Sequence, residues 1–253
     1  MEPVDSVAGL EPVPEADRSP GRLAERVTAL FEVVLCSSFP TQIAIAYVMG
    51  RAGSVPFDQH GRLSFLFVVG LALADSVVLV GLIFLFLHLH GESPRAMFLG
   101  DSSLVREAVL GLACIPLIVG IVVAVLLGVQ NFAPWLHNVR SNPLEGLIES
   151  RTDAGLFAIV AIVGGGVREE IQRAFILRRF ELHLGGAWVG VLLFSIVFGI
   201  GHILQGRDAA ITTGILGAVW GLIYLRRRSV LAPLVSHAGF NAAEILRYTV
   251  LGR

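Results

Sequence analysis

Long apolar runs, separated by short polar stretches, dominate the chain. A helix that spans a bilayer needs about 20 mostly apolar residues, and the pattern offers seven such segments. They cover residues 27–50, 63–88, 107–129, 154–177, 186–204, 209–225 and 230–251. The pattern therefore predicts an all-α fold, a polytopic transmembrane helix bundle of about seven spans.

Two stretches are too polar to cross a membrane. Residues 1–24 are acidic and non-periodic and contain prolines, so we predict a disordered tail rather than a cleavable signal peptide. Residues 130–153 are predicted to form an interfacial helix with Trp135 and Leu136 at headgroup level. The predicted domains are a tail of residues 1–24, membrane helices with the interfacial segment over residues 25–153, and a C-terminal core of residues 154–253.

Composition supports a membrane protein. Of the 253 residues 55% are hydrophobic and 15% are charged, whereas about a quarter are charged in a soluble domain. The net charge of −1 gives no reason to expect a nucleic-acid partner. Cys36 and Cys114 fall inside apolar runs and are interpreted as small core residues, without a disulfide framework or redox motif.

The distribution of arginine sets the predicted orientation, because cytoplasmic loops are enriched in basic residues. Seven spans place ten arginines on one side: Arg18, Arg22, Arg26, Arg95, Arg106, Arg178, Arg179, Arg226, Arg227 and Arg228. The other side receives five: Arg51, Arg62, Arg140, Arg151 and Arg207. We therefore predict an integral protein of the bacterial inner membrane with a cytoplasmic N-terminus.

One predicted span contains a cluster of charges. The stretch "VREEIQRAFILRRF" (residues 167–180) carries four charges within six residues: Arg168, Glu169, Glu170 and Arg173. A charge at the bilayer centre costs about 2.5–3.5 kcal/mol on insertion scales, so these groups must be paired or line a watery cavity. Glu169 and Arg173 are four residues apart and could simply neutralise each other. The glycines at 164–166 favour close helix packing or a local break.

Two further spans add side chains suited to catalysis. "FGIGH" ends in His202, and "HAGFN" places His237 and Asn241 four residues apart, on one helix face. Imidazole nitrogens, a carboxylate and a carboxamide can hold a metal or a reactive water, and the carboxylate can take its proton. The cost of burying these groups in a membrane favours a chemical role over a structural one.

These motifs resemble those of the CPBP family, which includes type II CAAX prenyl endopeptidases and bacteriocin-immunity relatives. The family pattern is Glu-Glu-x-x-x-Arg, then Phe-x-x-x-His, then His-x-x-x-Asn or Asp. The second motif matches at Phe198 and His202, and the third at His237 and Asn241. The resemblance covers about residues 154–250 and implies a four-helix catalytic core.

The first motif departs from the family pattern. If Arg173 takes the place of the motif arginine, Glu169 becomes the second glutamate and Arg168 occupies the first glutamate position. If Glu169 and Glu170 are aligned with the pair instead, Ala174 stands where arginine is expected. Either one of these glutamates transfers the proton from a shifted position, or the site is inactive.

The resemblance implies an intramembrane endopeptidase. His202 and His237, with Asn241, would hold the attacking water directly or through a zinc ion, which leaves metal dependence open. Glu169 is the preferred general base over Glu170. Arg173 would pair with that carboxylate or help to neutralise the oxyanion.

The implied partners are the lipid bilayer and a membrane-embedded or membrane-associated protein or peptide substrate. Two alternatives stay open: a non-catalytic scaffold or immunity-type protein, and a small-solute carrier. Helix rise from Arg178 and Arg228 places Glu169 and His237 at similar depth, but it places His202 deeper.

Overall fold

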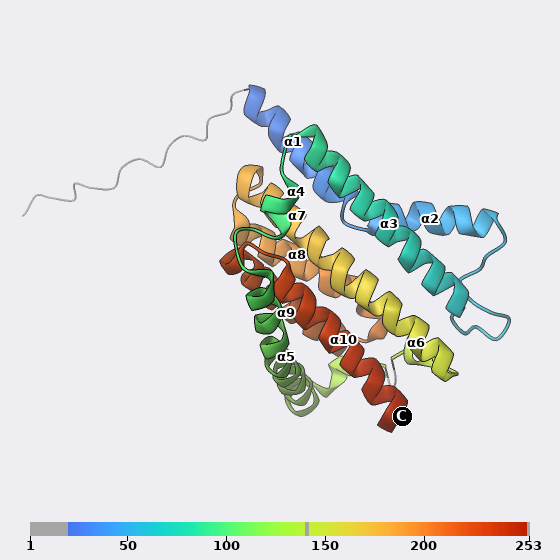
Figure 1. Ribbon diagram of the computed structural model, residues 1–253. Coiled ribbons are helices and arrows are strands. Elements are labelled where there is room, and N and C mark those ends of the chain that lie inside the picture. The colour runs from blue at the N-terminus through green and yellow to red at the C-terminus, as the bar shows by residue number, and fades with distance from the viewer. Residues whose placement is uncertain (1–19, 140–141, 252–253) are drawn as a thin grey trace, which may run out of the picture.

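The computed structural model describes residues 20–139 and 142–251 of the chain (Figure 1). No strand occurs among these residues, so the predicted all-α class is confirmed. The α-helices are α1 (Pro20–Leu35), α2 (Phe39–Arg51), α3 (Phe65–Leu89), α4 (Pro94–Phe98), α5 (Leu104–Phe132), α6 (Arg151–Val160), α7 (Glu169–His183), α8 (Ala187–Gly201), α9 (Arg207–Arg227) and α10 (Leu231–Leu251).

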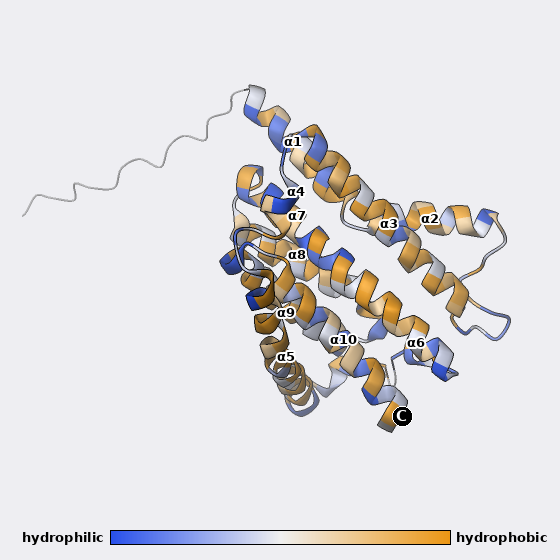
Figure 2. Ribbon diagram, in the orientation of Figure 1, coloured by the Kyte–Doolittle hydropathy of each residue, from blue (hydrophilic) through white to orange (hydrophobic). Residues whose placement is uncertain are grey.

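Seven spans are not confirmed. Three of the described helices, α3, α5 and α9, are long and apolar enough to cross a membrane by themselves, and the bent pair of α1 and α2 would be a fourth. Helix α8 is apolar but has only 15 residues. Figure 2 shows apolar residues along most of α3 and α8, and polar residues in α7. The protein is therefore an integral membrane protein whose number of spans is lower by this measure than the sequence predicts.

The first predicted span, residues 27–50, is two helices rather than one. Helices α1 and α2 meet at an angle of 44°, and Ser38 between them has a left-handed φ of 71°. Pro40 explains the break, because its ring would clash with the carbonyl of residue 36 in a continuous helix. Figure 1 shows α2 crossing α3 and projecting to the side of the bundle.

Two predictions about the polar stretches need correction. The helix α1 begins at Pro20, so residues 20–24 are helical rather than part of a disordered tail, and residues 1–19 lie outside the described part. Residues 130–153 do not form one interfacial helix. This stretch ends α5, makes the 3₁₀ turns Pro134–Leu136 and Glu145–Leu147, and begins α6 at Arg151, because prolines and glycine interrupt it.

The C-terminal half is a set of antiparallel helices. Helix α6 continues without interruption through a π-helical segment, Ala161–Arg168, into α7. Helices α8, α9 and α10 follow, each reversing direction (Figure 1). Close packing of α8 on α9 depends on Gly199, where a Cβ atom would lie 2.6 Å from the carbonyl oxygen of Ala210.

Ion pairs join the arginine-rich ends of α7 and α9 to their neighbours. Arg179 Nε lies 2.5 Å from Glu32 Oε2 on α1, and Arg228 Nη2 lies 2.7 Å from Glu181 Oε1 on α7. Arg227 donates from Nε to Glu107 of α5 over 3.0 Å. Three of the ten arginines that the sequence assigns to one side of the membrane thus pair with neighbouring helices at these ends, while the cytoplasmic location of this region stays a prediction.

Candidate active site

The π-helical segment carries the glycines that precede the charged cluster. A Cβ atom on Gly165 would lie 2.4 Å from Asn241 Nδ2, and one on Gly166 would lie 2.7 Å from the Cβ atom of Ala238. Both contacts are with α10. The close packing that the glycines predict is therefore present, and it brings the start of α7 against the helix that carries His237. π-Helical turns inside α-helices occur frequently at functional sites.

Arg173 pairs with Glu170 and not with Glu169. The pair is three residues apart on α7, and both side chains are only 1% exposed. Three aromatic rings surround the guanidinium carbon, at 5.1 Å from the centre of Phe198, 5.3 Å from that of Phe194 and 5.6 Å from that of Trp220. The predicted Glu169–Arg173 pair is therefore wrong.

One carboxylate oxygen of Glu169 is in an ion pair, and the other has no hydrogen-bond partner among the described residues. Its Oε1 lies 3.1 Å from Nη2 of Arg168. Its Oε2 is buried without a hydrogen-bond partner among the described residues and lies 3.8 Å from Nε2 of His237. A buried carboxylate oxygen without a donor is costly unless water or a ligand satisfies it, so the position of Oε2 is suited to a bound water.

His237 is held on two sides. Its Nδ1 lies 2.8 Å from Glu170 Oε1. Its ring stacks on Trp220, with the ring centres 3.8 Å apart and an angle of 16° between the planes. Trp220 is itself fixed by a 2.9 Å hydrogen bond from its Nε1 to Ser236 Oγ. A carboxylate at Nδ1 keeps a proton on that nitrogen, which leaves Nε2 facing Glu169.

His202 follows the last residue of α8 and is oriented in the same way. Its Nδ1 lies 2.8 Å from the carbonyl oxygen of Phe198. Because a carbonyl only accepts hydrogen bonds, Nδ1 is the donor and Nε2 is left for another partner. The ring of Phe198 lies 4.9 Å from that of His202 and 6.4 Å from that of His237, so one aromatic side chain contacts both histidines.

The depth of His202 agrees with that of Glu169 in the structure. Glu169 lies 14 residues before His183, where α7 ends, and His202 lies 15 residues after Ala187, where α8 begins. At about 1.5 Å per residue, these separations are about 21 Å and about 23 Å from the same turn. The prediction that His202 lies deeper than Glu169 is therefore wrong. It counted residues from Arg178, whereas the turn at residues 184–186 is the reference that both helices share.

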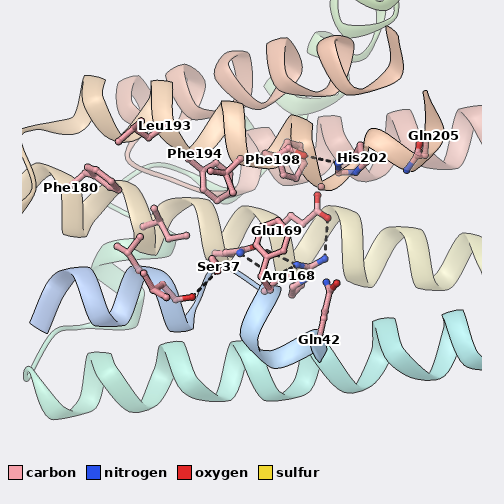
Figure 3. Close-up of a pocket in the computed structure, with 18 residues that line it drawn as sticks. Ser37, Gln42, Arg168, Glu169, Phe180, Leu193, Phe194, Phe198, His202 and Gln205 are labelled. Carbon is pink, nitrogen blue, oxygen red and sulfur yellow. Dashed lines mark hydrogen bonds and ion pairs between the residues drawn. The ribbon is translucent and has the colours of Figure 1, made fainter. Parts of the chain in front are cut away.

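Two cavities meet at the candidate site. The first has a volume of about 580 Å³ and lies between the α1–α2 break and helices α7 and α8 (Figure 3). The second has a volume of about 470 Å³ and is lined by α5, α9, α10 and the π-helical segment. Four residues line both: Arg168, Glu169, His202 and Gln205.

The remaining candidates divide between the second cavity and the interior. His237 and Asn241 line the second cavity, and Asn241 Nδ2 donates to the carbonyl oxygen of Ala161 over 3.3 Å. Glu170 and Arg173 are not among the residues that line either cavity. Of the two glutamates, only Glu169 is placed to meet a substrate.

Sequence reasoning missed two contributors. Trp220 lies in a span where only the glycines stood out, although a tryptophan six residues before the arginine-rich end was visible. Arg168 was treated as an irregularity of the motif, yet it contacts Glu169 directly.

Zinc binding stays a prediction. No group of three or more His, Cys, Asp or Glu side chains among the described residues is placed to hold a metal ion. Catalytic zinc takes three protein ligands, so His202 and His237 would need a third ligand. The chemistry considered below therefore uses the side chains alone.

Comparison with protein-family models gives a match to part of the chain. Residues 151–243 match the family model described as "Type II CAAX prenyl endopeptidase Rce1-like". This segment contains all of the predicted site residues: Glu169, Glu170, Arg173, His202, His237 and Asn241. No curated protein and no solved structure matches the chain.

Proposed function

We propose that this protein is an intramembrane endopeptidase of the CPBP type, a proposal supported by the match of residues 151–243 to the endopeptidase family model. It hydrolyses peptide bonds of membrane-embedded or membrane-associated proteins. One observation carries the proposal: Glu169 presents an unpartnered Oε2 in a wall shared by two cavities, 3.8 Å from His237 Nε2. Oε2 of Glu170 also lacks a hydrogen-bond partner, but Glu170 lines neither cavity, so only the free oxygen of Glu169 can meet a substrate.

Glu169 is the general base in this mechanism. A water between Oε2 of Glu169 and the Nε2 atoms of His202 and His237 gives one proton to Oε2 as its oxygen attacks the carbonyl carbon of the substrate. The tetrahedral intermediate carries a negative oxygen that needs a hydrogen-bond donor. Asn241 Nδ2 is a neutral donor beside the second cavity and is suited to this role.

Collapse of the intermediate breaks the carbon–nitrogen bond. Protonated Glu169 gives its proton to the departing nitrogen, so that an amine leaves and a carboxylic acid forms. General acid–base catalysis of this kind contributes about 10²- to 10⁴-fold to the rate. Water is consumed once, and the glutamate is regenerated.

Glu170 and Arg173 act behind the reacting groups. Glu170 fixes the tautomer and the ring orientation of His237 through Nδ1. Arg173 balances the charge of Glu170, and both side chains are almost completely buried. In this proposal neither residue touches the substrate.

The substrate reaches Glu169 along the first cavity. Apolar and aromatic side chains form most of its wall, including Val34, Ile176, Phe180 and Leu193. Figure 3 shows Phe180, Leu193, Phe194 and Phe198 arranged in a row that leads toward Glu169 and His202. An apolar segment of a membrane protein, with or without a lipid modification, suits this wall.

The test uses purified protein reconstituted in liposomes with membrane-anchored peptides, half of them carrying a prenyl group. Mass spectrometry identifies the cleaved bond. Glu169→Gln should lower the rate at least 100-fold, because it keeps the size of the side chain and removes the base. Glu149→Gln is the matched control, since Glu149 is 71% exposed and pairs with Arg62. Cleavage that survives in Glu169→Gln would exclude the proposed mechanism.

The scaffold and carrier alternatives are not favoured. The matched family is one of endopeptidases, and an unpartnered carboxylate oxygen that lies near His237 and faces two cavities has no evident use in a scaffold.

A further inference from the structure

We propose that Arg168 is a positioning residue that holds the catalytic carboxylate of Glu169 and links it to the α1–α2 break. The inference rests on the proposed function and adds a residue to it. It assigns a role to the arginine at the position where the family motif has a glutamate.

The first step is the contact between Arg168 and Glu169. Nη2 of Arg168 lies 3.1 Å from Oε1 of Glu169. Fixing one oxygen determines where the other one points, and the free Oε2 faces His237. A buried glutamate that is not held in this way keeps several rotamers, whose loss costs up to about 2 kcal/mol. Displacement of a reacting group by about 1 Å can cost about 100-fold in rate, so holding this carboxylate has a direct catalytic effect.

The second step is what holds Arg168. Its Nη1 donates to Ser38 Oγ over 2.6 Å and to Gln172 Oε1 over 3.3 Å, and it lies 3.6 Å from Asp75 Oδ2. The guanidinium group is planar and rigid, so the contacts at Nη1 also fix the position of Nη2, which contacts Glu169. Only 13% of the side chain is exposed.

The third step is the connection to the break. Ser38 is the left-handed residue between α1 and α2. Gln172 also donates to the carbonyl oxygen of Cys36 over 2.7 Å, and Asp75 accepts hydrogen bonds from Thr41 and Gln42 at the start of α2. The same segment forms a wall of the first cavity. A substrate that fills this cavity therefore contacts the segment on which the orientation of Arg168 depends.

Charge gives an independent reason to assign Arg168 to Glu169 rather than to the substrate. Asp75 and Glu169 both lie within 3.6 Å of its guanidinium group, whereas Arg173 already balances Glu170. The single positive charge of Arg168 thus faces two carboxylates, so the negative charge around it is in excess. An additional anionic group from a substrate would be repelled here, which makes a role in substrate capture unfavourable.

The experiment compares Arg168→Gln, Arg168→Lys and Ser38→Ala with wild type in the liposome assay, beside Glu169→Gln. We expect Arg168→Gln to lower kcat at least tenfold while KM changes less than threefold, and we expect Arg168→Lys to recover part of the loss. Ser38→Ala should lower kcat in the same direction. Arg178→Gln is the matched control, because Arg178 is 40% exposed and pairs with Glu181 on the same helix.

A double-mutant cycle tests the link to the break. If Ser38 acts through Arg168, the variant carrying both Ser38→Ala and Arg168→Gln should be no slower than Arg168→Gln alone. If the fold-decreases in kcat of the two single variants multiply in the double variant, the link is overturned. If kcat of Arg168→Gln stays within twofold of wild type, the positioning role is overturned. Should Arg168→Gln fail to accumulate in membranes, Arg168→Lys and Ser38→Ala decide the same question. If the wild type is inactive, the proposed function is refuted. If cleavage depends on Glu169 but not on Arg168, only the positioning role of Arg168 is refuted.

Discussion

Replacement of Glu170 by glutamine should lower stability strongly, whereas replacement of Glu169 should lower activity and leave stability nearly unchanged. In Glu170→Gln, Arg173 becomes a cation with 1% exposure and no carboxylate partner. Breaking a buried ion pair by removing one partner costs about 3–5 kcal/mol. The aromatic rings around Arg173 remain, and the glutamine oxygen can still accept from His237, so we expect the lower value, about 3 kcal/mol.

That loss corresponds to a measurable change in the unfolding temperature. For a chain of 150–250 residues, 1 kcal/mol shifts the midpoint by about 2–4 °C, which gives a decrease of about 6–12 °C. A thiol-reactive fluorophore can follow unfolding in detergent, because Cys36 is completely buried in the folded protein. In Glu169→Gln, Arg168 keeps Ser38 and Gln172 as partners, so a decrease below about 4 °C is expected.

Matched controls decide between the two glutamates. The double variant Glu170→Gln with Arg173→Met should recover much of the lost stability, since an apolar replacement of a buried pair is often neutral. If Glu170→Gln unfolds within 2 °C of wild type, the pair does not stabilise the fold. If Glu170→Gln abolishes cleavage in folded protein and Glu169→Gln does not, the assignment of the base is wrong.

Three further predictions follow from the site and the topology. Alanine at His202 or at His237 should each abolish cleavage, and the double variant should be no worse, because both hold the same water; separate, partial losses measured in the liposome assay would contradict a shared water. Gly165→Ala should lower kcat, because its Cβ atom would lie 2.4 Å from Asn241 Nδ2, whereas Gly155→Ala has nothing within 4 Å and should leave kcat unchanged. A cysteine placed at residue 226 should react with an impermeant thiol reagent only after permeabilisation of intact cells, and labelling from outside would reverse the predicted orientation.

The sequence was sufficient to predict several residues that the structure brings to the same cavities, because local spacing carries part of the information. His237 and Asn241 are four residues apart on one helix, and both line the second cavity. Preference for Glu169 as base agrees with its place in the cavity walls, although the reason given for it, a pair with Arg173, is wrong.

The partner of Arg173 could not be predicted from spacing. Residues three and four apart are both neighbours on a helix, so Glu169 and Glu170 were equally within reach. What decides between them is the direction in which α7 leaves the π-helical segment, and that depends on how Gly165 and Gly166 pack against α10. Such packing is a tertiary contact that leaves no periodic signal in the sequence.

The break inside the first predicted span could not be predicted for a similar reason. Hydropathy alone treats residues 27–50 as one apolar run, and the break at Ser38 depends on Pro40, a single residue. The role of Trp220 could not be predicted because its stacking on His237 is a tertiary contact between α9 and α10.

The short length of α8 has a consequence for how water enters the bilayer. At about 1.5 Å per residue its 15 residues extend about 23 Å, whereas the hydrocarbon core is about 30 Å thick. The backbone of residues 202–206 therefore ends the helix at a level where lipid tails offer no hydrogen bonds, and such backbone is tolerated only beside protein or water. A bilayer adapts to a short apolar helix by thinning, so the lipids around α8 should bring headgroups and their hydration toward His202, and the membrane itself would supply the reactant that the hydrolysis consumes.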